Sequence, residues 1–247
     1  MLYSLYRPRQ FQDVLGQDNL TTILKAQTKA HLWHHAYLFH GASGTGKTST
    51  ARILASVLNC YNLNGVGEPC GECQSCKAIA KGSSWDVHEI DGADFRGIDD
   101  MRELKAKAYL SPLGKYKVYI IDECHCLSEP AFNLLLKLLE EPPPHLVVIL
   151  CSSNADKIPA TVKSRCQGYP FKALKPSVIK GKLERIAKDL RVEISSTSLS
   201  FVARMACGNM REAENQLEQN LMLSPNTKAR HRLAKKIVAV REHARLV

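Results

Sequence analysis

His40-Gly41-Ala42-Ser43-Gly44-Thr45-Gly46-Lys47-Thr48 contains a complete phosphate-binding loop of the form G-x-x-x-x-G-K-[ST]. Residues 36–39, immediately before it, are a short apolar run suited to a buried strand, and residues 48–58 after it carry apolar side chains at helical spacing. Strand, glycine-rich loop and helix therefore follow one another in the order that such a loop requires. A glycine-rich turn that matches the motif by chance is the alternative, and it does not account for these flanks.

The loop has the residue types needed to hold the phosphates of ATP. Its glycines let backbone N–H groups approach phosphate oxygens, and the following helix presents the positive end of its dipole to the same anion. Lys47 adds a positive charge that binds the β and γ phosphates, and it is also predicted to be a catalytic residue. The hydroxyl of Thr48 is predicted to bind Mg²⁺. The predicted nucleotide-binding residues of this stretch are Gly41, Ala42, Ser43, Gly44, Thr45, Gly46, Lys47, Thr48 and Ser49.

A second stretch indicates what the nucleotide is used for. Residues 117–121 are an apolar run typical of a buried strand in a parallel sheet, and Asp122 and Glu123 follow it directly. Because ligands of open α/β sheets bind beyond the carboxyl ends of the strands, both carboxylates should face the phosphates. Asp122 then suits the Mg²⁺ shell, and Glu123 is placed to polarise a water. The pair therefore indicates that the bound nucleotide is hydrolysed. The alternative, a surface Asp-Glu pair without function, is less consistent with a complete phosphate loop in the same chain.

Four of the nine cysteines form a C-x9-C-x2-C-x2-C array within residues 60–76. The four are Cys60, Cys70, Cys73 and Cys76. Such a set predicts a tetrahedral structural Zn²⁺ site, with an iron–sulfur cluster or unligated buried cysteines as alternatives. Cys124, His125 and Cys126 are interpreted as core packing instead of a second metal site.

The composition of the chain limits its cellular location and the kinds of partner it can bind. The 247 residues are 45% hydrophobic, the first residues lack the apolar stretch of a signal peptide, and no apolar run approaches the roughly 18 residues of a membrane span. We therefore expect a cytoplasmic protein that does not contact a membrane. The net charge is +10, and residues 226–247 hold seven Lys or Arg against one Glu. This basic segment suits a phosphate-rich partner such as DNA, and equally an ordinary solvated helix face.

The order of the patterns predicts two domains. Residues 146–151 form another apolar run, which should bring Ser152 and Ser153 to the same sheet edge as Asp122. From residue 172 on, strand signals give way to helical spacing. We expect an α/β core with a parallel sheet flanked by helices over residues 1–171, a helical domain over 172–224, and a basic helical tail over 225–247.

The complete set of motifs resembles one family. Its members are the gamma/tau subunits of bacterial DNA polymerase III, the ATPases of the sliding-clamp loader in the AAA+ superfamily. The resemblance covers residues 1 to about 224, cysteine insert included. It rests on Tyr6-Arg7-Pro8, Asp13-Val14-Leu15-Gly16-Gln17, the phosphate loop, the four cysteines, Asp122-Glu123-Cys124-His125, Leu134-Leu135-Leu136-Lys137, Glu140-Glu141-Pro142-Pro143, Ser164-Arg165-Cys166 and Gly208-Asn209-Met210-Arg211-Glu212-Ala213.

The resemblance implies further site residues. Adenine would pack among Tyr6, Arg7, Pro8, Val14 and Leu15. Ser153 would be the polar sensor near the γ-phosphate, although the family commonly has Thr at that position. Arg165 would act in trans on ATP bound by a neighbouring subunit, and Arg211 would reach the nucleotide of its own subunit. Extra guanidinium groups stabilise the charge of a phosphoryl-transfer transition state, which makes both assignments chemically reasonable.

The resemblance also implies a function: ATP-dependent loading of a sliding clamp onto primed DNA, together with other loader subunits, using ATP, Mg²⁺ and Zn²⁺. Another AAA+ DNA motor and a non-cycling scaffold relative are the alternatives. The cysteine insert argues against the motor. The intact Lys47 and Glu123 argue against the scaffold, and the missing third helical domain, of which only residues 225–247 could be the start, argues for it.

Overall fold

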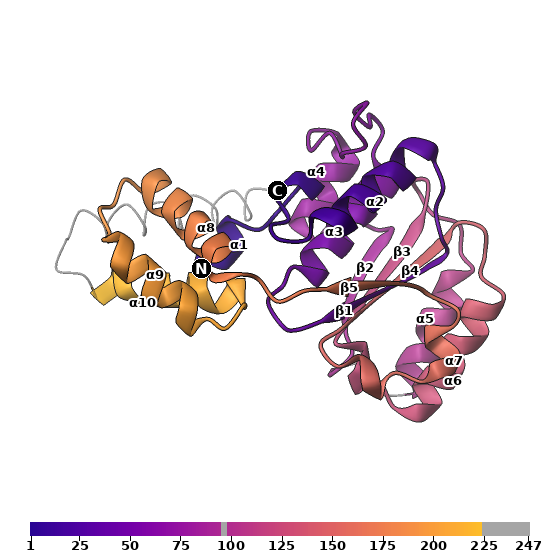
Figure 1. Ribbon diagram of the computed structural model, residues 1–247. Helices are drawn as coiled ribbons and strands as arrows, with labels where there is room; N and C mark the ends of the chain where they lie inside the picture. The colour runs from indigo at the N-terminus through magenta and orange to yellow at the C-terminus, as the bar shows by residue number, and fades with distance from the viewer. Residues whose placement is uncertain (95–97, 224–247) are drawn as a thin grey trace. The chain divides into compact units, whose positions relative to one another are not determined.

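The computed structural model describes residues 1–94 and 98–223 of the chain (Figure 1). The predicted basic helical tail, residues 225–247, lies outside the described residues. The chain divides into two compact units. One contains residues 8–42 and 46–171, and the other contains residues 1–7 and 43–45 and begins again at Lys172.

The larger unit is built on a five-stranded parallel sheet of order β2-β3-β4-β1-β5. Its strands are β1 (Ala36–Gly41), β2 (Val87–Asp91), β3 (Lys117–Asp122), β4 (Leu146–Ser152) and β5 (Gln167–Phe171). β4 is buried along its whole length and β3 up to its last residue. The apolar runs predicted as strands therefore form the centre of the sheet, as expected for parallel strands covered on both faces.

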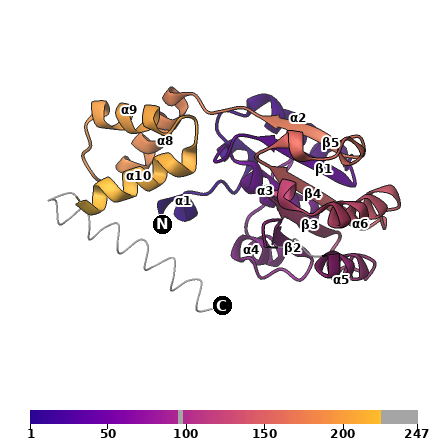
Figure 2. The same cartoon turned by 90° about the horizontal axis from the view of Figure 1, so that it is seen from below.

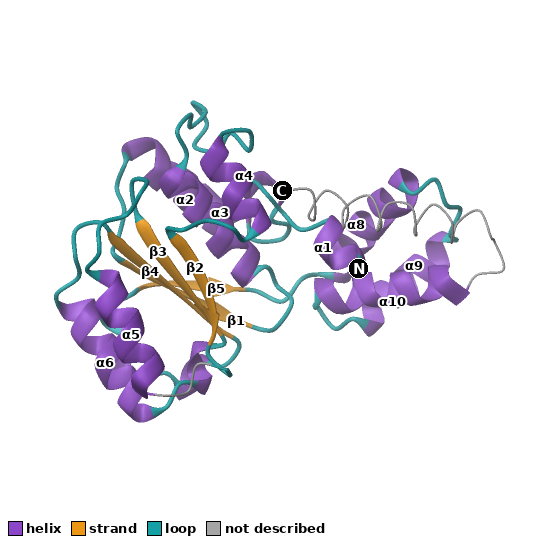
Figure 3. Ribbon diagram, turned by 180° about the vertical axis from the view of Figure 1, so that it is seen from behind, coloured by secondary structure: helices purple, strands orange, loops and turns teal. Residues whose placement is uncertain are grey.

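Helices cover both faces of this sheet (Figure 3). One face carries α2 (Asp18–Ala30) and α3 (Lys47–Asn59), with α4 (Gln74–Lys81) packed against α3. The other carries α5 (Ile98–Ala108), α6 (Glu129–Glu140) and α7 (Ala160–Lys163), as Figure 1 shows. Each face has its own apolar core, one around Phe39 and Leu54 and one around Ile121 and Leu135.

Among the described residues, three short 3₁₀ helices connect these elements. They are η1 (Phe11–Asp13), η2 (Cys124–Cys126) and η3 (Ala155–Lys157). η1 belongs to the segment before α2, and η2 directly follows the Asp-Glu pair after β3. The segment between α1 and α2 therefore contains one turn of helix that begins at Phe11.

The smaller unit is helical (Figure 2). It consists of α8 (Pro176–Asp189), α9 (Ser196–Met205) and α10 (Met210–Leu223), together with α1 (Leu2–Leu5), which packs against α10. Its interior includes Leu183, Ile186 and Leu217, all of which are almost fully buried. Within residues 1–94 and 98–223, the helices are too short or too polar to cross a bilayer.

Candidate nucleotide-binding site

The phosphate loop joins β1 to α3 and begins at a glycine that the fold requires. Gly41 has φ +139°, and a Cβ added to it would lie 2.2 Å from the backbone oxygen of Phe171 on β5. β1 and β5 are adjacent parallel strands in which Gly41 pairs with Phe171. Only glycine therefore fits at the point where the chain leaves the sheet and enters the loop.

Lys47 is held inside the loop. Its side chain is buried, and its Nζ donates hydrogen bonds of 2.8 Å to the backbone oxygens of Gly41 and Ala42. Burial lowers the pKa of the Lys47 ammonium, and the nearby carboxylates of Glu123 and Asp122 act in the opposite direction. The ammonium group of Lys47 therefore lies against the backbone of the loop that is predicted to bind phosphate.

A hydroxyl and a carboxylate lie side by side where α3 begins and β3 ends. The Oγ1 of Thr48 donates to the Oδ2 of Asp122 at 2.7 Å. Burial raises the pKa of the Asp122 carboxyl, and the hydrogen bond from Thr48 lowers it. Oxygen donors of these two types are what Mg²⁺ requires beside a bound nucleotide. The structure therefore brings together the two residues predicted from separate motifs, and their donor atoms fit the ion.

Glu123 lies next to this pair in an unusual backbone conformation. Its φ is +43°, in the left-handed region, which is uncommon for a residue other than glycine and concentrates at functional sites. The Oε2 of Glu123 accepts hydrogen bonds from the backbone N of Ser153 at 3.1 Å and from its Oγ at 2.8 Å. Because β3 and β4 are adjacent, Glu123 and Ser153 meet at their carboxyl ends.

His125 completes this group, contrary to the sequence analysis. Its Nδ1 lies 3.2 Å from the Oγ of Ser152 and 3.3 Å from the Oε2 of Glu123. The core-packing interpretation holds for Cys124, which is fully buried, and is wrong for His125. The available signal was its position two residues after a candidate catalytic Glu, at the end of the same strand. We call Asp122, Glu123, His125, Ser152 and Ser153 the strand-end cluster.

The residues expected around adenine do not all belong to one unit. Val14 lies beside the phosphate loop, since a Cβ added to Gly46 would be 3.6 Å from its Cγ1. Val14 is buried and Leu15 is half-buried. Tyr6 and Arg7 belong to the helical unit, where the Tyr6 hydroxyl donates to Asp189 of α8. Burial, followed by the interaction with Asp189, raises the pKa of Tyr6.

The two predicted arginines have protein partners. Arg165, just after α7, contacts the Oε1 of Glu140 at 2.7 Å and the backbone oxygen of Thr161 at 2.8 Å. Arg211 lies near the start of α10 in the helical unit, with its guanidinium 4.5 Å from the centre of the Tyr3 ring, a cation–π arrangement.

The first residue of α10 also reaches the tip of the phosphate loop. The backbone N of Met210 donates to the oxygen of Gly44 at 3.0 Å, a contact between residues that both belong to the helical unit.

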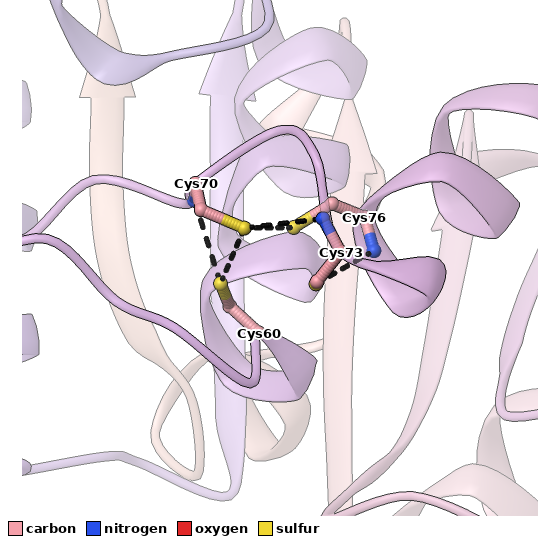
Figure 4. Close-up of side chains that lie close together, drawn as sticks. All are labelled: Cys60, Cys70, Cys73 and Cys76. Carbon is pink, nitrogen blue, oxygen red and sulfur yellow. Dashed lines mark hydrogen bonds between the residues drawn. The ribbon is translucent and has the colours of Figure 1, made fainter.

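The four predicted cysteines are brought together near the end of α3 and the start of α4 (Figure 4). Their sulfur atoms all lie within 4.8 Å of one another, and among the described residues they are the group of this kind that suits a metal. Backbone N–H groups of Cys70, Cys73 and Cys76 point to the sulfurs of the preceding cysteines at 3.3–3.4 Å. The backbone N–H groups of Cys73 and Glu72 lower the pKa of Cys70 to about 6, whereas burial raises the pKa of Cys60 and of Cys76.

This donor set fits a structural Zn²⁺ ion. Four thiolates are one of the standard ligand sets for such an ion, and they leave no open coordination position for a substrate. The cysteine cluster, as we call Cys60, Cys70, Cys73 and Cys76, is therefore compatible with zinc.

Comparison with known proteins adds the family. Residues 16–175 match the family model described as "DNA polymerase III, delta subunit". DNA polymerase III subunit tau of Bacillus subtilis strain 168 is 44% identical over 224 residues, which is 90% of this chain and 40% of that protein. Subunit tau of Escherichia coli K12 is 40% identical over 87% of this chain and 33% of its own length. The chain thus spans about 40% or less of these relatives.

Solved structures agree on the fold. The Thermotoga maritima RuvB Holliday junction branch migration motor superposes with a TM-score of 0.64 at 18% identity, over 88% of this chain and 66% of that one. The likeness supports the predicted architecture, an α/β core with a parallel sheet followed by a small helical domain. The chain belongs to the DNA polymerase III subunit family whose model it matches, and the resemblance to the gamma/tau subunits is confirmed.

Proposed function

We propose that this chain binds and hydrolyses ATP as a subunit of a bacterial clamp loader, working in the cytoplasm with other loader subunits, a sliding clamp and primed DNA. The observation that carries the proposal is the convergence of two hydrogen-bonded pairs at one sheet edge, Thr48 with Asp122 and Ser153 with Glu123. Membership of the DNA polymerase III family supports the assignment to replication.

In this proposal each group at the sheet edge has one task. Lys47 and the loop N–H groups bind the β and γ phosphates, and Thr48 and Asp122 hold Mg²⁺, which when bound neutralises phosphate charge. Glu123 accepts a proton from the attacking water, and Ser153 fixes the direction of its carboxylate through the 2.8 Å hydrogen bond.

Other residues complete the proposed site from outside this edge. Val14 and Leu15, with Tyr6, Arg7 and Pro8, contact the adenine. Arg211 acts on the nucleotide of its own chain, and Arg165 acts on that of a neighbouring subunit. Extra guanidinium donors of this kind stabilise the charge that develops on the transferred phosphoryl group.

We also propose a division of the chain into domains. Residues 1–171 form the ATPase core and residues 172–224 the lid, with the difference that residues 1–7 pack with the helices of the lid in the structure. The cysteine cluster binds one Zn²⁺ that is structural. Its position away from the sheet edge, between α3 and α4, supports this role.

The test separates binding from turnover. Lys47→Ala is expected to abolish productive ATP binding, because it removes the cation that holds phosphate in the ground state. Glu123→Gln is expected to bind ATP normally and to lose turnover by about 10²–10⁴-fold, the range of general-base catalysis. Nucleotide affinity and hydrolysis rate are measured for both, with and without clamp and primed DNA. Normal turnover in Glu123→Gln would sink the assignment of the base.

A further inference from the structure

Glu68 lies in the loop between Cys60 and Cys70 and is almost fully buried, with 1% of its surface exposed. Its Oε2 accepts a hydrogen bond from the backbone N of Phe11 at 2.7 Å, and its Oε1 accepts one from the backbone N of Gln12 at 3.0 Å. These N–H groups belong to the first turn of η1, where a helix has no internal acceptors for them. A residue of the cysteine insert therefore caps a helix in the N-terminal arm.

An ion pair and a close packing contact hold the loop that carries Glu68 against α2. The Nζ of Lys25, on α2, lies 2.7 Å from the Oε1 of Glu68. Gly67, next to Glu68, has φ +81°, and a Cβ there would lie 2.8 Å from the backbone oxygen of Lys25. The turn that carries both is closed by the side chain of Asn64, whose Oδ1 accepts from the backbone N of Glu68 at 2.8 Å. Glu68 is thus held at a fixed position against α2.

The capped helix is linked to the phosphate loop through Val14. The backbone N of Val14 donates to the oxygen of Phe11 at 3.1 Å, so that η1 sets where Val14 lies. Phe11 and Val14 are both buried in the core that also contains α3. Val14 in turn reaches the vicinity of Gly46. A continuous series of contacts therefore runs from Glu68 through η1 to the loop.

We propose that Glu68 is a positioning residue for the base of the nucleotide. It holds η1 so that Val14 and Leu15 present their side chains to the adenine. The cysteine cluster, which joins both ends of the loop carrying Glu68, makes this positioning depend on the metal. The inference rests on the proposed function, in which adenine contacts Val14 and Leu15, and it concerns the base alone, because the phosphates are bound by Lys47 and the loop.

Two ligands separate the base from the phosphates: ATP, and inorganic tripolyphosphate, which lacks the nucleoside. Their affinities are measured on the full chain for the wild type, Glu68→Ala, Glu68→Gln and Glu72→Ala. Glu72 is an exposed acid of the same insert and serves as the matched control. Metal content and circular dichroism report on folding.

Glu68→Ala is expected to weaken ATP binding about tenfold and to leave tripolyphosphate binding within about twofold, because two buried N–H groups and Lys25 lose their acceptor. Glu68→Gln should lie between Ala and the wild type, since its amide oxygen can still accept one N–H but carries no charge for Lys25. Wild-type protein stripped of metal by a chelator should show the same selective loss, and Glu72→Ala should behave as the wild type.

Equal weakening of both ligands, or unchanged ATP affinity in Glu68→Ala, would overturn the inference. If Glu68→Ala does not fold, Glu68→Gln decides by the same criterion. A wild type that binds ATP no more tightly than tripolyphosphate would instead remove the proposed adenine site, and the inference with it. A wild type that discriminates, together with a Glu68 variant that discriminates equally well, contradicts only the role of Glu68.

Discussion

The strand-end cluster and the cysteine cluster belong to the same α/β unit but are assembled in different ways. The first joins residues about 30 positions apart, such as Glu123 and Ser153, and the register of β3 and β4 brings them together. The second lies within residues 60–76 and is closed by local N–H···S contacts. A sheet that is already stable supports the first, whereas the second must supply part of its own stability. Changes in the first should therefore alter the reaction, and changes in the second should alter folding and, through Glu68, the affinity for ATP.

The largest expected effect tests whether the strand-end cluster is complete within one chain. If a neighbour's Arg165 completes it, Arg165→Ala should lower the hydrolysis rate of the assembled loader by about 10³–10⁵-fold, or about 4–7 kcal/mol of barrier. The basal rate of the isolated chain should hardly change. Steady-state ATPase assays with and without the other loader subunits, clamp and primed DNA measure both rates.

Arg165→Lys is the matched variant, because it keeps the charge and loses the two-pronged geometry of the guanidinium. It should recover only a small part of the stimulated rate. A high basal rate that responds to Arg165→Ala as strongly as the stimulated rate would mean that Arg165 does not act across subunits.

The second prediction tests the cysteine cluster. Wild-type protein purified without chelator should contain about one Zn²⁺ per chain, and Cys73→Ser should lose it. The free energy of unfolding should then fall by about 4 kcal/mol, since metal binding is coupled to folding and metal loss is among the large destabilising changes. Denaturant titration measures this difference.

Cys207→Ser provides the control, because Cys207 is an exposed thiol in the helical unit. It should retain both metal and stability. The hydrolysis rate of folded Cys73→Ser at saturating ATP should stay near the wild-type value. Iron in place of zinc, or full stability without metal, would contradict the separation drawn between the two clusters.

The sequence predicted the centre of the sheet and failed at its edges, for a physical reason. Central strands such as β4 are buried on both faces and are continuous apolar runs, which are easily recognised. β2 and β5 are the edge strands, and no sequence pattern identified them. β2 has no fully buried residue, and β5 contains Gly168 and Pro170, which an edge strand tolerates because it has an unpaired side.

In the candidate site, too, some residues could be predicted from the sequence and others could not. Thr48 and Asp122 were predicted because each belongs to a motif whose place in the fold is fixed, and the structure pairs them at 2.7 Å. His125 and Glu68 were missed because their partners come from other segments, Ser152 on β4 for one and Phe11 in η1 for the other. Local sequence gives no spacing from which such contacts can be inferred.

The smallest expected effect concerns His125, which links the two halves of the strand-end cluster. His125→Ala should lower kcat about tenfold, because the loss of its hydrogen bond with Ser152 and of its 3.3 Å contact with Glu123 corresponds to about 1–1.5 kcal/mol and leaves the carboxylate less well directed. ATP affinity should stay unchanged, since His125 lies beside the proposed base and outside the phosphate loop. His125→Asn, whose amide can still donate, should recover part of kcat. Cys126→Ser, in the same 3₁₀ helix, should match the wild type. Single-turnover hydrolysis and nucleotide binding, measured together, separate these effects. A change in affinity with kcat unchanged would show that His125 serves binding instead of the orientation of Glu123.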